Sequence, residues 1–231
     1  MISAPPLLSS HAVRSCSVSR RGLTLLALAA LLLGACATGQ RPHFADDPQF
    51  PLEELTGDPA IDAVLGKLDG ATTGPATAQY SVLTKYGNAT HTAMVVLSPG
   101  KRSVTIDNTH YVQTESVAAT CTIEPVACVN GFDATRISDT GVTYDFYAAA
   151  AAKKLRRSAA AKIGPAIAST QSIAQQNATC VDVPVSGGTL VYCALDSGLL
   201  AKQDDGAVLV TVTLFAATAD ANNFVPPVEP V

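Results

Sequence analysis

The strongest constraint on the fold is a succession of short strand-like segments separated by tight turns, which occupies most of the sequence after residue 79. β-Branched and aromatic residues are frequent in these segments, as in strands with a buried face. The linkers are turn-forming pairs or triplets such as Gly87-Asn88, Pro99-Gly100 and Ser186-Gly187-Gly188. Parallel strands need crossovers of about a dozen residues or more, so these short linkers predict antiparallel meanders. We expect strands over 80–86, 92–98, 103–107, 110–114, 179–185, 189–193, 199–200 and 207–217.

Two segments have the pattern of helices. Asp58-Pro59 is a typical helix start, with Asp as the N-cap and Pro at the first position, and Gly70 is a typical stop. A second helix is expected over 144–162, where alanines and straight-chain basic residues have high helix propensity. In the first helix, a spacing of i, i+3, i+4, i+7 predicts one buried face formed by Ile61, Val64, Leu65 and Leu68.

The first 36 residues have the three-part build of an export signal. Arg20 and Arg21 precede an apolar run over 23–33, which is short for a membrane-spanning helix of about 20 apolar residues. Leu33-Gly34-Ala35-Cys36 resembles the bacterial lipobox. The resemblance implies that the signal is cut away before Cys36, whose thiol then carries diacylglycerol and acyl chains such as palmitate. An ordinary signal peptide and an uncleaved anchor are the alternatives.

The expected organisation is a lipoprotein signal peptide at 1–35, a lipidated N-terminus with a polar, Pro-bearing tether at 36–57, and one α+β domain at 58–231. Two acyl chains are enough for stable anchoring. We expect an exported protein held by lipid on the outer face of the cell membrane. In a host with two membranes, Ala37 after the Cys resembles sorting to the outer membrane. Arg20-Arg21 also resembles a twin-arginine signal, which leaves the export route open.

The charge balance excludes one class of partner. The chain holds 15 Lys and Arg against 19 Asp and Glu, and every acidic residue follows position 45. Without the first 35 residues, which contain three arginines, the net charge is −7. An anionic body of this kind argues against nucleic acid as a partner.

Four cysteines remain after the signal region, namely Cys121, Cys128, Cys180 and Cys193. An even number in an exported domain predicts two disulfides. If Ser186-Gly187 is a two-residue hairpin loop, the last two cysteines face each other in a non-hydrogen-bonded pair, about 4.5 Å apart at Cα. That separation lies within the disulfide range of roughly 4.4–6.8 Å, and the first two cysteines then close a local loop. Four free buried thiols and a Cys-rich metal site are the alternatives.

A search for catalytic and metal-binding patterns finds none that supports an enzyme. His43, His91 and His110 do not have the spacing of metal ligands. Ser197 lies in Asp196-Ser197-Gly198, which predicts a turn and not a nucleophile elbow. Asp204-Asp205 could contact a cation, but an acidic hairpin turn is the ordinary explanation. We expect no enzyme, no metal and no cofactor besides the lipid on Cys36.

One cationic cluster interrupts the negative charge of the domain. Lys153, Lys154, Arg156 and Arg157 follow one another in the second expected helix. Such a cluster could touch anionic lipid headgroups near the membrane that carries Cys36. The alternative is an ordinary solvated helix face.

The order of elements resembles that of the exported lipid-carrier lipoproteins of the LolA and LprG/LppX kind. The local points of resemblance are 61–68, Tyr144-Asp145-Phe146 and Phe224-Val225-Pro226-Pro227. The resemblance implies a curved antiparallel sheet, or half-barrel, over a few helices, with an apolar cavity between them for a lipid. Small residues over 148–152 could form a thin wall of that cavity, or could simply allow close packing. The four cysteines are not part of the carriers' general pattern.

The sequence thus predicts a membrane-anchored, non-enzymatic lipoprotein of the cell envelope that binds or carries a lipid or another hydrophobic ligand. A tethered structural or protein-interaction lipoprotein with a filled core is the alternative. No residue is singled out for the ligand, and a protein partner is not identified.

Overall fold

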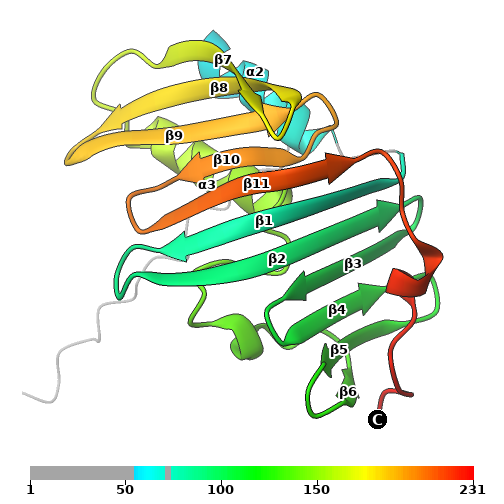
Figure 1. Ribbon diagram of the computed structural model, residues 1–231. Helices are drawn as coiled ribbons and strands as arrows, with labels where there is room; N and C mark the ends of the chain where they lie inside the picture. The colour runs from blue at the N-terminus through cyan, green and yellow to red at the C-terminus, as the bar shows by residue number, and fades with distance from the viewer. Residues whose placement is uncertain (1–54, 71–73) are drawn as a thin grey trace, which may run out of the picture. The chain divides into compact units, whose positions relative to one another are not determined.

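Eleven strands form one antiparallel sheet in the order β6-β5-β4-β3-β2-β1-β11-β10-β9-β8-β7 (Figure 1). The structure is a computed structural model that describes residues 55–70 and 74–231. The strands are β1 (Ala76–Thr84), β2 (Ala89–Ser98), β3 (Lys101–Ile106), β4 (Thr109–Gln113), β5 (Ala118–Thr122), β6 (Ala127–Asn130), β7 (Ile167–Ile173), β8 (Gln176–Val185), β9 (Gly188–Leu195), β10 (Leu200–Asp204) and β11 (Val208–Ala216).

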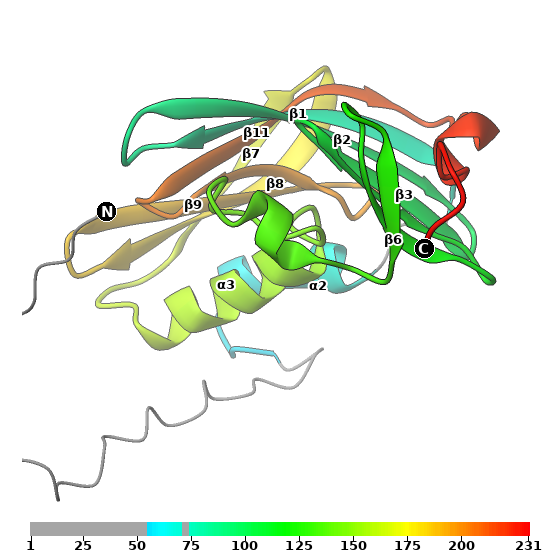
Figure 2. The ribbon, with the colours of Figure 1, turned by 90° about the horizontal axis from the view of Figure 1, so that it is seen from below.

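The sheet is built from two meanders, as the short linkers predicted. Strands β1 to β6 follow one another in space, and so do β7 to β11. The meanders join in the middle of the sheet, where β1 pairs with β11, the first strand along the chain with the last. The fold is therefore the expected α+β class, with a sheet that curves over its helices (Figure 2).

The register of the β8–β9 hairpin is the predicted one. Val185 pairs with Gly188, and Cys180 stands directly opposite Cys193 with 4.0 Å between their Cα atoms. The two sulfurs form a disulfide. Gly187 has φ +104°, in the left-handed region that glycine adopts without steric cost, so the sequence of the turn sets this register.

The second expected disulfide also forms, but its surroundings differ from the expectation. Cys121 and Cys128 form a disulfide. They lie directly opposite each other in the β5–β6 hairpin, one pair away from the turn. We expected the two cysteines to close a small local loop, which contains Pro125. Pro125 lies in the hairpin turn, and two short strands pair on either side of it.

Helix α2 (Pro59–Asp69) has the predicted start and the predicted buried face. The carboxylate of Asp58 accepts a hydrogen bond from the amide of Ala60 at 3.1 Å, and Gly70 follows the last helical residue. Burying a large aliphatic side chain contributes about 1.5–3 kcal/mol, so this face holds the helix firmly on the sheet. The face consists of Ile61, Val64, Leu65 and Leu68.

Helix α3 (Ala149–Ala160) is shorter than the expected helix over 144–162. The residues before it form turns, with the amide of Phe146 bonded to the carbonyl of Thr143 and that of Ala148 to the carbonyl of Asp145. Their aromatic side chains pack inward, and this packing overrides the helical propensity of the segment. No helix in the described part of the chain has the length and apolar character needed to span a membrane.

The segment between β6 and α3 crosses from one half of the sheet to the other beneath its concave face (Figure 2). It includes the 3-10 helix η2 (Ala134–Ile137) and a set of aromatic anchors. The ring of Phe146 meets that of Tyr80 edge to face, with 5.0 Å between centroids. The guanidinium of Arg102 lies 5.0 Å from the ring of Phe132 and 5.2 Å from that of Tyr144, in cation–π geometry. This segment therefore fills the space under β1 to β4.

The chain after β11 crosses back toward β6 (Figure 1). It contains the 3-10 helix η3 (Ala221–Phe224), which contacts β3 and β4. At its end, the carbonyl of Val231 accepts a hydrogen bond from the amide of Asn130, and the amide of Val231 donates to the carbonyl of Cys128. The tail is thus partly helical, and it reaches the β6 edge of the sheet.

Candidate functional site

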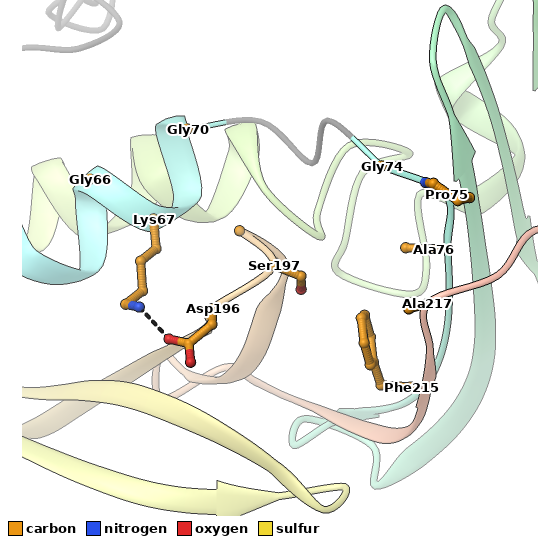
Figure 3. A pocket seen from close by; sticks show the side chains of 11 residues that line it. Gly66, Lys67, Gly70, Gly74, Pro75, Ala76, Asp196, Ser197, Phe215 and Ala217 are labelled. Atoms are coloured by element: carbon orange, nitrogen blue, oxygen red, sulfur yellow. Dashed lines mark hydrogen bonds and ion pairs between the residues drawn. The ribbon is translucent and has the colours of Figure 1, made fainter.

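A pocket of about 380 Å³ opens where the end of α2 meets the sheet (Figure 3). Its wall combines the last turn of α2 and the start of β1 with the β9–β10 turn and the end of β11. Segments about 130 residues apart in the sequence therefore share one site. The lining residues are Gly66, Lys67, Gly70, Gly74, Pro75, Ala76, Asp196, Ser197, Gly198, Phe215 and Ala217.

Glycines leave the space that the pocket occupies. A Cβ atom added at Gly66 or Gly74 would meet no heavy atom within 4 Å. Gly66 lies inside α2, where glycine costs roughly 0.5–1 kcal/mol relative to alanine. The helix carries this cost at a position that faces open space, so no packing contact explains the absence of a side chain.

An ion pair stands at the rim. The ammonium of Lys67, on α2, lies 2.5 Å from Oδ1 of Asp196, in the β9–β10 turn (Figure 3). The Asp196 side chain is 70% exposed and that of Lys67 28%, so water screens the pair. Exposed pairs of this kind contribute about 0–1 kcal/mol to stability. The rim therefore offers both charges to a ligand at little cost to the fold.

One lining residue has a hydroxyl without a partner. Oγ of Ser197 is buried and makes no hydrogen bond with any residue that the structure describes. A buried unsatisfied hydroxyl costs about 1–3 kcal/mol. Phe215 and Ala217 provide apolar surface, and the lining contains neither His nor Cys. The arrangement suits the binding of an amphiphile, and it pairs no nucleophile with a base.

The site lies away from the wall expected at 148–152. In α3, Ala151 and Ala152 are fully buried in the main core, so these alanines serve close packing. Tyr192 and Leu155 are buried in the same core, and the hydroxyl of Tyr192 lies 3.0 Å from Oγ of Ser158. Burial raises the pKa of Tyr192 to about 12, which keeps this phenol neutral. The space between α3 and the sheet is thus occupied by side chains.

The four cations of α3 do not form one exposed patch. Lys153 and Arg157 are exposed, whereas the ammonium of Lys154 lies 2.8 Å from Oδ2 of Asp205. Arg156 is only 3% exposed, and its guanidinium contacts both carboxylate oxygens of Asp69, at 3.1 and 2.5 Å. The expectation of a shared cationic face is corrected for Arg156, because that side chain joins α3 to the end of α2. Contact of the cluster with headgroups stays a prediction.

Asp204 and Asp205 have structural roles in the β10–β11 turn. Oδ1 of Asp204 lies 2.6 Å from the ammonium of Lys85, and Asp205 binds Lys154 and the amide of Val208. Burial acts to raise the pKa of Asp205, but the hydrogen bonds from Lys154 and Val208 outweigh it and hold the pKa below its usual value. An ionised Asp pair held by lysines is the acidic hairpin turn that the sequence also allowed.

The histidines serve local contacts. Nδ1 of His91 lies 2.6 Å from Oδ2 of Asp107, and Nε2 of His110 lies 2.8 Å from Oγ of Ser103. Burial lowers the pKa of His110, although a hydrogen bond with the backbone of Asn223 partly opposes the shift. Across the described ranges, no three His, Cys, Asp or Glu side chains gather as metal ligands would.

Several predicted residues lie outside the described ranges. These are His43 and the signal and lipobox positions Arg20, Arg21, Leu33, Gly34, Ala35 and Cys36. Lipidation of Cys36 therefore stays a prediction. The pocket was not predicted from the sequence. The one signal for it was the recurrence of glycine at positions 66, 70 and 74, in and after the last turn of α2.

No protein-family model and no curated protein matches this chain. Among solved structures, it is similar to LprF from Mycobacterium bovis, with a TM-score of 0.39 and 14% identity over 70% of this chain and 94% of that chain. It is also similar to MucB in complex with MucA(peri), with a TM-score of 0.37 and 10% identity over 73% of this chain. The Pseudomonas aeruginosa MucA/MucB complex gives a TM-score of 0.32 and 9% identity over 72% of this chain. The chain spans 60% of the length of each of the last two, and likeness at this level carries no functional information.

Proposed function

We propose that this chain is an exported, non-enzymatic cell-envelope protein, held to a membrane through lipid on Cys36, and that its domain binds a single-chain amphiphile in the pocket beside α2. The observation that supports the ligand is the lining of the pocket, where the apolar surface of Phe215 and Ala217 lies in the same site as the exposed Lys67–Asp196 ion pair. Two disulfides support export, since such bonds persist in oxidising compartments.

The size of the pocket favours a small ligand. Its volume of about 380 Å³ lies toward the lower end of the roughly 300–1,000 Å³ of ligand sites. A lipid with several chains would need additional room between sheet and helices, where α2 and α3 bury their side chains. One alkyl chain against Phe215, with a polar head near Ser197 and the Lys67–Asp196 pair, matches the lining.

Titration calorimetry with lauric acid, below its micelle concentration, tests the proposal. Gly66→Leu places a side chain in the pocket without a clash at Cβ, and we expect it to weaken binding by at least about tenfold, or 1.4 kcal/mol. Ala63→Leu, at an exposed α2 position outside the lining, is the matched control and should bind like the unmodified chain. Equal affinity of the two variants, or no uptake of lauric acid by the unmodified chain, would refute the pocket as a ligand site.

The membrane anchor has a separate test. Replacing Cys36 with Ala should release the protein from isolated membranes, because the acyl chains supply the anchoring free energy. Unchanged retention would count against the lipobox and leave the pocket proposal untouched.

A tethered protein-interaction or structural role is the second candidate, and the filled space between helices and sheet favours it. Native mass spectrometry of the exported protein separates the two. A bound fatty acid or lysolipid supports the amphiphile carrier. A mass equal to that of the protein alone, with no fatty acid bound after incubation, supports the interaction protein.

A further inference from the structure

Strand β7 forms one edge of the sheet and is exposed along almost its whole length. Its sequence, Ile-Ala-Ser-Thr-Gln-Ser-Ile over 167–173, contains no charged residue and no proline. Each residue except Ile173 is exposed, and Ile167 is 63% exposed. Edge strands in native proteins are commonly protected by lysines, prolines, bulges or a covering segment. Among the described residues, none pairs with the outer side of β7.

The hairpin geometry identifies the free backbone groups. Ala174 and Gln175 form a two-residue turn with positive φ at both positions, +49° and +62°. The pair that closes such a turn, Ile173 with Gln176, is hydrogen-bonded, and bonded and non-bonded pairs then alternate. Ser169 and Gln171 therefore also bond to β8. The amides and carbonyls turned to the outer edge are those of Ala168, Thr170 and Ser172.

The strand is nearly symmetric about Thr170. Isoleucines stand at both ends, and small or polar residues lie between them. We propose that β7 pairs with β7 of a second copy of this chain, antiparallel, about a two-fold axis at Thr170. Ile167 then lies opposite Ile173 of the partner subunit, and Ala168 lies opposite Ser172 of the partner subunit. All outward backbone groups of Ala168, Thr170 and Ser172 acquire partners in this register.

The lack of charge on β7 permits this occupant, and the size of the contact sets the strength of the pairing. The domain is anionic, but two copies of an uncharged strand place no like charges opposite each other. The paired segment is about 23 Å long, and it buries less than the roughly 1,200 Å² of a stable interface. The dimer is therefore weak in dilute solution, and it forms where copies are concentrated. The inference does not depend on the pocket.

Cysteine cross-linking of the full chain in the cell envelope tests the register. We expect Thr170→Cys, with copper phenanthroline as oxidant, to give a reducible dimer, because the two Cα atoms lie about 5.5 Å apart. Ala168→Cys and Ser172→Cys are matched controls on the same edge, whose equivalent positions lie about 13 Å apart along the strands. We expect on the order of tenfold less dimer from either, since a disulfide spans at most about 6.8 Å between Cα atoms.

Sedimentation velocity of the purified full chain provides an independent readout. The unmodified chain should associate as its concentration rises, and Thr170→Lys should remain monomeric because two ammonium groups would meet at the axis. Gln79→Lys, at an exposed position inside the sheet, should associate normally. Equal cross-linking at all three cysteine positions, or a monomer at every concentration with no Thr170→Cys dimer, would overturn the proposal.

Discussion

The two edges of the sheet are protected in opposite ways. Strand β6 has four residues, is bonded to its neighbour β5 through Cys121–Cys128, and pairs with the backbone of Val231. Strand β7 has seven residues, and its outer backbone groups find no partner among the described residues. The nearest disulfide, Cys180–Cys193, joins β8 to β9 and stops one strand short of this edge.

The difference shows that edge protection and covalent reinforcement are separate features of this fold. The β6 edge is short, cross-linked and covered, so it offers little template to another chain. The β7 edge is long and carries no charged side chain. The neighbouring β8–β9 hairpin, however, is cross-linked by a disulfide. This disulfide stabilises β8, the strand with which β7 pairs. This arrangement suits an edge that makes reversible contacts.

The largest expected effects come from breaking the two disulfides in turn. Replacing Cys180 and Cys193 by Ala should cost about 3 kcal/mol, and replacing Cys121 and Cys128 about 2.5 kcal/mol, because the first pair closes the longer loop. Urea unfolding of the exported protein measures both losses. Dithiothreitol treatment of the unmodified chain, which removes both bonds, is the control. A larger loss at the β6 edge would contradict the loop-length argument.

A smaller effect should follow from uncovering β6. Removing residues 228–231 deletes the two hydrogen bonds between Val231 and the strand. We expect a loss of about 1–2 kcal/mol and faster hydrogen exchange at the amide of Asn130, since a typical hydrogen bond contributes about 0.5–1.5 kcal/mol.

The matched control for this truncation is Val231→Ser, which keeps the backbone and changes an exposed side chain. It should exchange at Asn130 like the unmodified chain. If the truncated chain also keeps its slow exchange there, the pairing with Val231 does not protect the edge.

Much of the fold followed from local patterns in the sequence. The buried face of α2 and the β8–β9 register came from residue spacing and turn chemistry, which act over a few positions. Strand β7 was missed because it buries neither face, so no apolar alternation marks it. The start of α3 was misplaced because aromatic side chains before Ala149 pack against distant strands.

The pocket was beyond local reasoning for a related physical cause. Lys67 and Asp196 lie 129 positions apart in the sequence, and the tertiary fold brings them together, so residue spacing does not predict their contact. The same holds for Arg156, whose cluster looked like a surface patch. Its burial depends on Asp69, which lies 87 positions earlier in the chain. Pairing of charges across the fold, and not their density along it, decided which cations are exposed.

The smallest expected effect concerns the segment that reaches the β6 edge. His110, on β4, contacts Ser103 and the backbone of Asn223 in that segment, and burial lowers its pKa. The unfolded chain therefore binds a proton first, near pH 6.5, and stability should fall as the pH drops from 7.5 through 6.5 toward the lower folded-state pKa of His110. Asp204 and Asp205, whose pKa values are also lowered, lose their contribution only in more acidic solution, below the unfolded value of about 3.9.

His110→Gln removes the titrating group but keeps a side chain able to form hydrogen bonds, so the pH dependence between 7.5 and 5.5 should flatten. Urea midpoints of both proteins at the two pH values measure the change, which should be well below the disulfide effects. If the urea midpoint of the variant depends on pH as strongly as that of the unmodified chain, a group other than His110 causes the dependence. If the flattening occurs and the protection factors of β6 amides, which correct for the slower intrinsic exchange in acid, also fall at pH 5.5 in the unmodified chain, then the cover of this edge is pH-sensitive. The β7 edge has no ionisable residue and should show no such dependence.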